Sequence, residues 1–504
     1  MKADKVLKAL LLAGMALMIP CYLFTVGNVT LSHWPLYDRN RIALVMITAV
    51  CFAALLLALR TADRHEAFFV KHEKRVMIVA AVFYFIAQMM MANVLRFVPK
   101  TDAEQCFTAA ELIVDTGTFG NAERPFIYFT RYPFNLGFVY LLAGTFKLFG
   151  MLGWADRYMQ AALVCTALFT LGLLSGARAV RRMGGVKAQT RFLVLCASCL
   201  PLMYCTTELY TDAFSLAFPL MSVYAFCRLR DAEDFKSSVI WTLVFAAASF
   251  IGAQIRFTSV IAVIACMIVL AFEKRGRPFA MAGVLLAVVF LGGNAAVDAY
   301  THTHLSPEDI EKNELPRLHH IAMGLPIHED HGYGQYGEGG WLIFSTSFED
   351  PEERKAALME EIIDRLYYLR VPSRMLNMMS RKNLSTFGDG TFLLNEIIEA
   401  DAPQADNIVK QVIFSGGALY RGYYHLCTGM FMAQMLIACL ACAQAVRRRD
   451  TSGAAVFISL VGIFLVLCMW ETRGRYFFQY QMILLCAGSL LNTIKNKTAI
   501  DSRQ

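Results

Sequence analysis

Long apolar runs alternate with short polar segments along almost the whole chain. The runs are about 17–22 residues long, which is the length an α-helix needs to cross about 30 Å of hydrocarbon. This pattern predicts an all-α polytopic membrane protein with about 12 transmembrane helices. The predicted spans cover residues 6–27, 42–60, 77–97, 157–178, 189–206, 212–228, 237–254, 257–272, 278–298, 424–444, 453–470 and 474–492.

Composition agrees with a membrane protein. The chain has 504 residues, of which 57% are apolar and 17% charged, and its mean hydropathy is +0.47. Soluble domains have roughly 45–50% apolar and about 25% charged residues. The net charge of +7 does not indicate nucleic-acid binding, because the Lys and Arg residues lie in short loops between spans.

These basic loops predict the orientation in the membrane. Every second loop is basic, for example Arg60–Arg75, Arg178–Arg191 and Arg447–Arg449. Cytoplasmic loops carry this excess, so both termini are expected in the cytoplasm of a multi-pass cell-membrane protein. The first run, 6–27, is too long for a signal-peptide core and is expected to be retained.

One apolar stretch, 133–150, conflicts with this orientation if it is counted as a span, because all later basic loops would then face outside. We therefore predict that it lies along the outer membrane interface. The stretch 349–369 has apolar residues at helical spacing and predicts an amphipathic helix over the membrane face. The expected organisation is two extra N-terminal helices (1–76), a transmembrane core (77–298) with a first extracytoplasmic loop (98–156), a large mixed extracytoplasmic loop domain (299–423) and C-terminal helices (424–504).

Four segments on the predicted outer side carry a family resemblance. They are TDAEQCFTAAELIVDTG (101–117), RYPFNLGFVYLLAGTFKLFG (131–150), TTELYTDAF (206–214) and WETRGRYFFQYQ (470–481). Their order resembles GT-C type membrane glycosyltransferases, close to family 39, the protein-mannosyltransferase and aminoarabinose-transferase group. The resemblance implies transfer of a sugar, with inversion, from a polyprenyl-phosphate-linked donor to an extracytoplasmic acceptor. That acceptor would be a cell-wall polymer, a lipid or a protein.

Two acids follow the third predicted span, and acids at the end of a span are functional candidates. Asp102 is the expected catalytic base, which takes the proton of an attacking hydroxyl group or orients the acceptor. The alternative is an N-cap of a helix over 103–115. Glu104 is the second catalytic candidate, although the paired acids of the family appear here separated by one residue.

A lipid-phosphate leaving group requires cations, and a guanidinium group can bind phosphate with two hydrogen bonds. Arg256, Arg473 and Arg475 lie at outer ends of spans, and Lys382 lies in the large loop. All four are candidates for donor phosphate binding. Ion pairs of the arginines with Glu471, Glu208 or Asp212 are the alternative.

Acceptor or sugar contacts are expected from polar and aromatic side chains on the same side of the membrane. Asp212 could instead cap the next helix, and the tyrosines could belong to an interfacial aromatic belt. The candidates are Glu208, Tyr210, Asp212, Arg131, Tyr132, Glu471 and Tyr476.

No metal or other cofactor is expected. His319, His320, His328 and His331 are metal-ligand types, but their spacing selects no geometry, and the family resemblance implies a metal-independent enzyme. The pairs Cys196–Cys199 and Cys439–Cys442 fall within predicted spans, where packing is the simpler role, and we expect no disulfides.

Two other functions remain open from the sequence. A polysaccharide polymerase or ligase would place catalysis on Arg and His residues of 299–423 and would not need Asp102. A lipid-linked sugar flippase or transporter would need polar residues within the spans, yet the spans are nearly free of charge.

Overall fold

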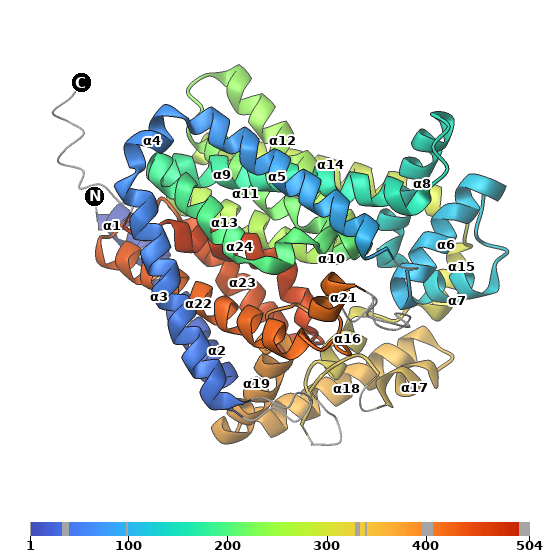
Figure 1. Ribbon diagram of the computed structural model, residues 1–504. Coiled ribbons are helices and arrows are strands. Elements are labelled where there is room, and N and C mark those ends of the chain that lie inside the picture. Colours follow the sequence, from blue (N-terminus) through green and yellow to red (C-terminus); the bar gives the residue numbers. More distant parts are fainter. Residues whose placement is uncertain are drawn as a thin grey trace.

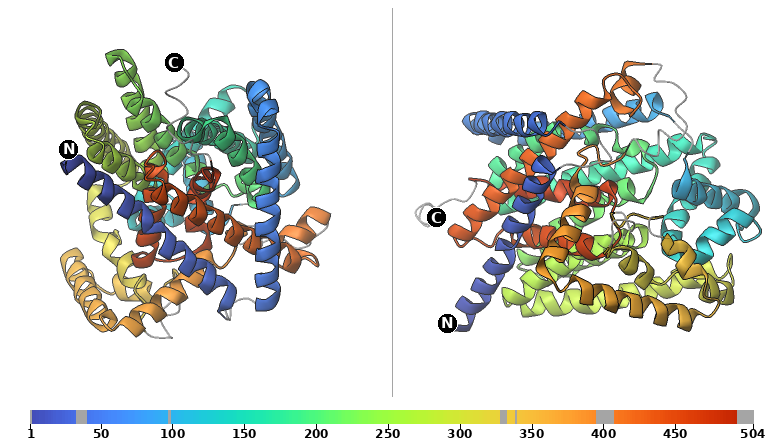
Figure 2. Two further views of the ribbon diagram at one scale, coloured as in Figure 1. Left: turned by 90° about the vertical axis from the view of Figure 1, so that its left-hand side faces the viewer. Right: turned by 90° about the horizontal axis from the view of Figure 1, so that it is seen from below.

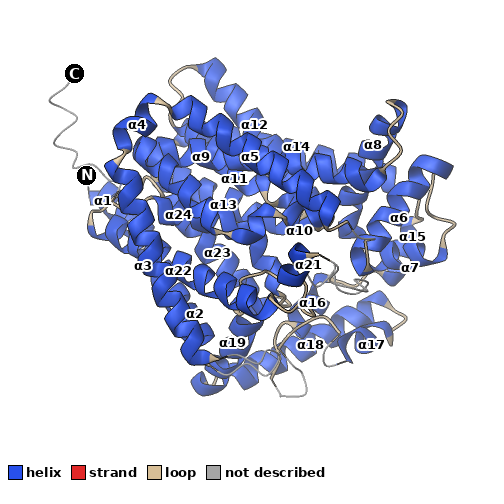
Figure 3. Ribbon diagram, in the orientation of Figure 1, coloured by secondary structure: helices blue, strands red, loops and turns tan. Residues whose placement is uncertain are grey.

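The computed structural model describes residues 2–32, 40–96, 99–327, 333–337, 340–394 and 407–492. This described part consists of helices and turns and contains no strand (Figure 3). The predicted all-α polytopic membrane fold is therefore confirmed. Among the described residues, eight helices are long and apolar enough to cross a membrane, and Phe257–Phe272 and Ala454–Met469 are shorter apolar helices. The number of 12 spans stays a prediction.

The apolar helices form the body of the molecule (Figure 1). They are α1 (Lys2–Ala16), α2 (Met18–Leu31), α3 (Arg41–Arg64), α5 (Glu73–Val94), α8 (Leu136–Met151), α9 (Arg157–Ser198), α11 (Ala217–Arg230), α12 (Phe235–Ile255), α13 (Val260–Phe272), α14 (Gly276–Thr301), α22 (Tyr420–Arg447), α23 (Ala454–Met469) and α24 (Gln481–Ser489).

Shorter helices connect them or build the loop segments. They are α4 (Glu66–Lys71), α6 (Thr101–Thr116), α7 (Glu123–Arg131), α10 (Thr211–Ser215), α15 (Pro307–Asn313), α16 (Arg317–Met323), α17 (Trp341–Thr346), α18 (Pro351–Leu369), α19 (Pro372–Phe387) and α21 (Ile408–Ile413).

Helix α9 (Arg157–Ser198) contains the predicted span 157–178 and the first part of the predicted span 189–206, whose remaining residues form short 3₁₀ segments. Gly185 interrupts its helical geometry with φ +75° and ψ −169°. Phe192, after this break, lies directly against Gly176, before it. Two positions 16 residues apart in a straight helix would be separated by about 24 Å. The helix therefore folds back on itself, and the left-handed conformation at the turn favours glycine.

Three apolar clusters hold the molecule together. The largest joins the N-terminal helices α1–α3 to α22, α23 and α24, so helices from the beginning of the chain lie beside α22 and α23 (Figures 1 and 2). A second cluster joins α6, α7 and α8 to α10, α12 and the part of α9 that precedes Gly185. The third comprises α16, α17, α18 and α19. The described part of 299–423 contributes to all three clusters.

Helix α18 confirms the amphipathic helix predicted for 349–369. Asp350 caps it by accepting a hydrogen bond of 2.9 Å from the Glu352 N–H. Leu358 and Ile362 are buried against neighbouring helices, whereas Ile363, Leu366 and Tyr367 are exposed. The helix therefore has a second apolar face, which suits contact with a membrane surface.

The placement of 133–150 stays a prediction. Pro133–Met151 is long and apolar enough to cross a membrane by length and composition. Within the structure, α8 packs mainly on α6 and also contacts α9 and α12. The distribution of Lys and Arg residues among the loops remains the argument for placing 133–150 at the outer interface.

Candidate active site

Four interruptions of helical structure bring the candidate residues together. Asp102 lies in the first turn of α6 and Asp212 in the first turn of α10. Arg256 follows the last residue of α12, and Arg475 lies in a 3₁₀ segment, η7 (Gly474–Tyr480). Acids at helix N-termini and a cation at a C-terminus interact favourably with the helix dipole. Neither acid is an N-cap, because Lys100 and Tyr210 hold those positions.

Asp212 is the buried centre of this cluster. Its side chain is fully buried, and its Oδ1 lies 2.7 Å from Arg256 Nη1. Its Oδ2 lies 3.6 Å from Arg475 Nε. Arg256 also donates a hydrogen bond of 3.1 Å to Thr211 Oγ1. A buried carboxylate needs such compensation, because desolvation of one unpaired charge costs several kcal/mol.

Asp102 is the accessible acid of the cluster. Its side chain is 41% exposed, and its Oδ2 lies 3.5 Å from Arg475 Nη2. Arg475 therefore contacts both a buried and an exposed carboxylate. Thr101, immediately before Asp102, has φ +54°, which is rare for a β-branched residue. Such backbone strain persists only where the surrounding structure enforces it.

Two tyrosines support the arginines. The Arg475 guanidinium lies 5.1 Å from the ring centre of Tyr210, and that of Arg256 lies 4.8 Å from the ring centre of Tyr476. These are cation–π distances. Tyr210 is buried, so its ring helps to hold Arg475 and has little surface for a sugar.

Glu471 organises the polar side chains next to η7. Tyr476 Oη donates a hydrogen bond to Glu471 Oε1, and His320 Nδ1 lies 3.4 Å from Oε2. Burial alone would raise the pKa of Glu471, but these partners and the charge of Arg475 hold it at about 2. His320 also stacks on Trp470, with ring centres 5.1 Å apart. Glu471 is therefore a permanent anion that fixes this segment.

An aromatic surface lies near Asp102. Tyr132 and Tyr336 share a hydrogen bond of 2.7 Å between their hydroxyl groups, and Tyr336 and Phe134 are exposed. Burial, together with the negative charge of Asp102, raises the pKa of both tyrosines. Arg131 connects α7 to the loop segment, because its carbonyl accepts a bond of 3.1 Å from the Leu315 N–H.

Sequence reasoning missed several of these neighbours. Tyr336, Phe134 and Trp470 were not candidates, and His320 was considered only as a metal ligand. The available signals were weak: Tyr336 is an aromatic residue in the Gly-rich stretch GYGQYGEGG, and Trp470 directly precedes ETRGRY.

Three predicted residues lie away from the Asp102–Arg475 contact. Glu104 is two residues from Asp102 on α6, which is about 200° around the helix, and among described residues it has no hydrogen bond or ion pair in common with the cluster. Glu208 is fully buried, and its charge acts on Arg475. Arg473 donates a hydrogen bond of 3.2 Å to Gln335 Oε1.

Lys382 requires a correction. Its side chain is 2% exposed, and its Nζ donates hydrogen bonds to the carbonyls of Gly324 and, at 2.6 Å, Trp470. An enclosed ammonium group that already has two acceptors cannot reach a lipid phosphate. The lysine instead connects α16 to the segment that carries Glu471.

The described residues contain no group of three or more His, Cys, Asp or Glu side chains that could hold a metal ion. His319 is buried against Ser345, with Nδ1 2.7 Å from Oγ, and burial lowers its pKa to about 4. His328 and His331 lie outside the described residues. The thiols of the two Cys-x-x-Cys pairs are free and buried.

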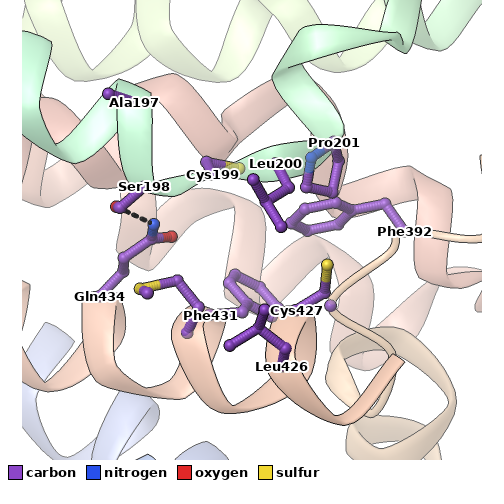
Figure 4. Close-up of a pocket in the computed structure, with 12 residues that line it drawn as sticks. Ala197, Ser198, Cys199, Leu200, Pro201, Phe392, Leu426, Cys427, Phe431 and Gln434 are labelled. Carbon is purple, nitrogen blue, oxygen red and sulfur yellow. Dashed lines mark hydrogen bonds between the residues drawn. The ribbon is translucent and has the colours of Figure 1, made fainter. Parts of the chain in front are cut away.

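An apolar cavity of about 180 Å³ lies between the end of α9 and α22. Figure 4 shows Leu200 and Phe392 facing Leu426 and Phe431 across it. Phe392 also packs on Phe478, with ring centres 5.1 Å apart. The side chain of Phe392 therefore lies between the cavity and η7, which carries Arg475.

Comparisons with known proteins give one family and two similar structures. A family model described as a conserved hypothetical integral membrane protein matches residues 15–496. No curated protein matches the chain. ArnT from Cupriavidus metallidurans bound to undecaprenyl phosphate is 14% identical, with 82% of this chain and 77% of that chain covered and a TM-score of 0.34. The apo state of the same enzyme is 13% identical, with 84% and 78% covered and a TM-score of 0.37.

Proposed function

We propose that this chain, which belongs to the conserved hypothetical integral membrane protein family, is a GT-C type glycosyltransferase of the cell membrane. It would transfer a sugar from a polyprenyl-phosphate-linked donor to an acceptor on the extracytoplasmic side. One observation carries the proposal: the exposed carboxylate of Asp102 lies beside Arg475, which a second, buried carboxylate holds in place.

The carboxylate of Asp102 suits the activation of an attacking hydroxyl group. A hydroxyl is a weak nucleophile, and a carboxylate within hydrogen-bond reach can take its proton as it attacks. Asp102 is exposed enough to meet an acceptor, whereas Asp212 is enclosed. The acceptor oxygen would form a bond to the anomeric carbon while the bond from that carbon to the phosphate oxygen breaks. The proton goes to Asp102, and the bonding electrons leave with the lipid phosphate.

The arginines suit the developing charge on that phosphate. A guanidinium group has five N–H donors, and Thr211 Oγ1 accepts a hydrogen bond from Nη1 of Arg256. Among the described residues, Arg256 Nε is buried without a hydrogen-bond partner. Arg256 and Arg475 would thus neutralise the leaving group while Asp212 keeps them in place.

The apolar cavity beside η7 supports a lipid donor. A polyprenyl phosphate has a charged head and a hydrocarbon tail, and its binding site must offer both environments. Phe392 contributes to the cavity and touches Phe478, three residues after Arg475. A polar and an apolar surface are therefore close together, as such a lipid requires.

The test is sugar transfer by the full-length protein in proteoliposomes. Radiolabelled sugars on a panel of polyprenyl phosphates would be offered together with a membrane extract as the source of acceptors. We expect transfer from at least one donor and a loss of at least about 100-fold in Asp102→Asn, since general base catalysis contributes about 10²–10⁴-fold. Glu123→Gln, an exposed acid on α7 outside the cluster, is the matched control and should retain transfer.

Near-normal transfer by a folded Asp102→Asn protein would contradict the proposal. If activity instead depended on residues of 299–423 and not on Asp102, the polymerase or ligase alternative would replace it. Movement of intact donor across the bilayer without bond cleavage would indicate the flippase.

A further inference from the structure

A polar hollow lies beside the C-terminal half of α6, away from Asp102. Its volume is about 520 Å³, and α6, the end of α8 and the start of α9 enclose it. Arg96, Glu111, Phe146, Trp154, Arg157 and Gln160 line it, and we call it the α6–α9 hollow. Figure 1 shows α6 and α8 at one end of the molecule.

The hollow contains a buried hydrogen-bond acceptor that lacks a donor. Gln160 is 1% exposed, and its Nε2 donates a hydrogen bond to the carbonyl of Trp154. This bond defines which amide atom is the oxygen. Among the described residues, Gln160 Oε1 has no hydrogen-bond partner. Leaving such a group without a donor costs about 1–3 kcal/mol, so the site favours a ligand that carries an O–H or N–H group.

The charged groups of the hollow are already paired with each other. Arg96 binds Asp156 with two hydrogen bonds of 2.7 and 2.9 Å. Arg157 binds Asp115 and lies 3.6 Å from Glu111. Two guanidinium groups thus face three carboxylates, which leaves a slight negative excess. This balance disfavours an anion and suits a neutral ligand whose groups both donate and accept hydrogen bonds.

Aromatic side chains complete the surface. Trp154 is half-buried beside the hollow, and the Arg96 guanidinium lies 5.5 Å from the ring centre of Tyr158. An aromatic face next to fixed hydrogen-bonding groups suits the C–H and O–H surfaces of a sugar ring. Leu148, Met151 and Leu152, at the adjacent end of α8, are exposed, which places the hollow beside an apolar surface.

We propose that the α6–α9 hollow binds a neutral saccharide and acts as a remote subsite for the acceptor glycan. This inference rests on the proposed glycosyltransferase function. Glu111 and Val114 follow Asp102 by nine and twelve residues on α6, which corresponds to about 14–18 Å along the helix. They also lie about 180° and 120° around α6 from Asp102, so an oligosaccharide with one end at Asp102 and the other in the hollow would pass around this helix. The saccharide could be a free glycan or the head group of a glycolipid, because the binding chemistry is the same.

Direct binding tests the subsite without requiring catalysis. The full-length protein in nanodiscs would be titrated with neutral trisaccharides (maltotriose, mannotriose and chitotriose), and saturation-transfer NMR would record binding. A second arm uses nanodiscs that contain a galactosyl diglyceride, which reports on the glycolipid source. We expect binding in at least one arm, and about two- to tenfold weaker binding in Gln160→Met, since one hydrogen bond is worth about 0.5–1.5 kcal/mol.

Two further variants keep the test decisive if Gln160→Met does not fold. Trp154→Ala removes the aromatic face, and Val114→Trp fills the hollow from α6; both should weaken binding. Glu123→Gln, an exposed acid on α7 that does not line the hollow, should bind as the parent protein does. Lack of binding in both arms, or equal binding by the folded hollow variants, would overturn the subsite and leave the transferase proposal intact. Preferential binding of inorganic phosphate would also overturn it. Loss of transfer in Asp102→Asn, together with loss of saccharide binding in the hollow variants, would support both proposals.

Discussion

At the scale of single residues, the candidate site depends on one carboxylate shared by two arginines. Asp212 is fully buried and lies 2.7 Å from Arg256 and 3.6 Å from Arg475. Without its charge, two cations would be left close together in a site that excludes water. Removing one partner of a buried ion pair typically costs 3–5 kcal/mol.

We therefore expect Asp212→Asn to lower the thermal unfolding temperature in detergent and to abolish sugar transfer, because Arg475 would no longer be held beside Asp102. The double variant Asp212→Asn/Arg256→Gln should recover part of the lost stability, since one unpaired cation is removed. Additive losses in the double variant would show that the two residues are not coupled.

Glu104 provides a second residue-scale prediction. Because it lies about 200° around α6 from Asp102, Glu104→Gln should reduce transfer much less than Asp102→Asn does. Initial transfer rates measured at equal expression would check this difference. Equal losses would mean that both acids act on the substrate.

At the scale of elements, the segment 470–476 is held from several directions. Lys382 on α19 bonds to the carbonyls of Gly324 and Trp470. Thr472 N donates a bond of 2.8 Å to the Gly334 carbonyl. Asn383, next to Lys382, donates a bond of 2.8 Å to Thr25 on α2. The N-terminal helices thus connect through α19 to the segment that carries Glu471 and Arg475.

The burial of Lys382 in this connection predicts that the stability of the folded chain depends on pH. Burial lowers the pKa of Lys382 from 10.5 to about 7. Between these two values the unfolded chain retains a proton that the folded chain has lost, so stability should rise with pH, by at most about 1.4 kcal/mol per unit. The neutral amine keeps two N–H donors, enough for both carbonyls. Unfolding temperatures at pH 6.5, 8 and 9.5 should therefore increase, and Lys382→Met should flatten this trend. An unchanged slope in the variant would assign the effect to another group.

At the scale of the whole molecule, the orientation of the candidate site depends on whether α8 crosses the membrane. Charge counting places 133–150 at the outer interface and the turn of α9 near Gly185 in the cytoplasm. A fluorescent-protein fusion truncated at Met183 should therefore fluoresce, and an alkaline phosphatase fusion there should be inactive. The phosphatase fused after Gly153 should be active. The opposite result at Met183 would make α8 a span and move the later loops to the other side.

Much of the candidate site could be predicted from the sequence. The long apolar runs located the helices. Charged residues in a membrane protein occur mainly at the ends of such helices, so Asp102, Asp212, Arg256 and Arg475 could be selected as candidates. Their pairing could not be predicted, because Asp102 and Arg475 are 373 residues apart and several arginine–acid combinations were equally compatible with the sequence.

The sequence by itself determined the class of protein, the amphipathic α18 and the set of charged residues at helix ends. These features follow from local composition and from the spacing of apolar residues along the chain. The tertiary structure decided that Asp102 is the exposed acid, that Asp212 is the buried acid shared by two arginines, and that Lys382 is a buried connector. It also placed Gln160 without a donor in the α6–α9 hollow. Burial and hydrogen bonding depend on segments that meet only in the folded chain, and they decide which of several chemically similar residues can meet a substrate.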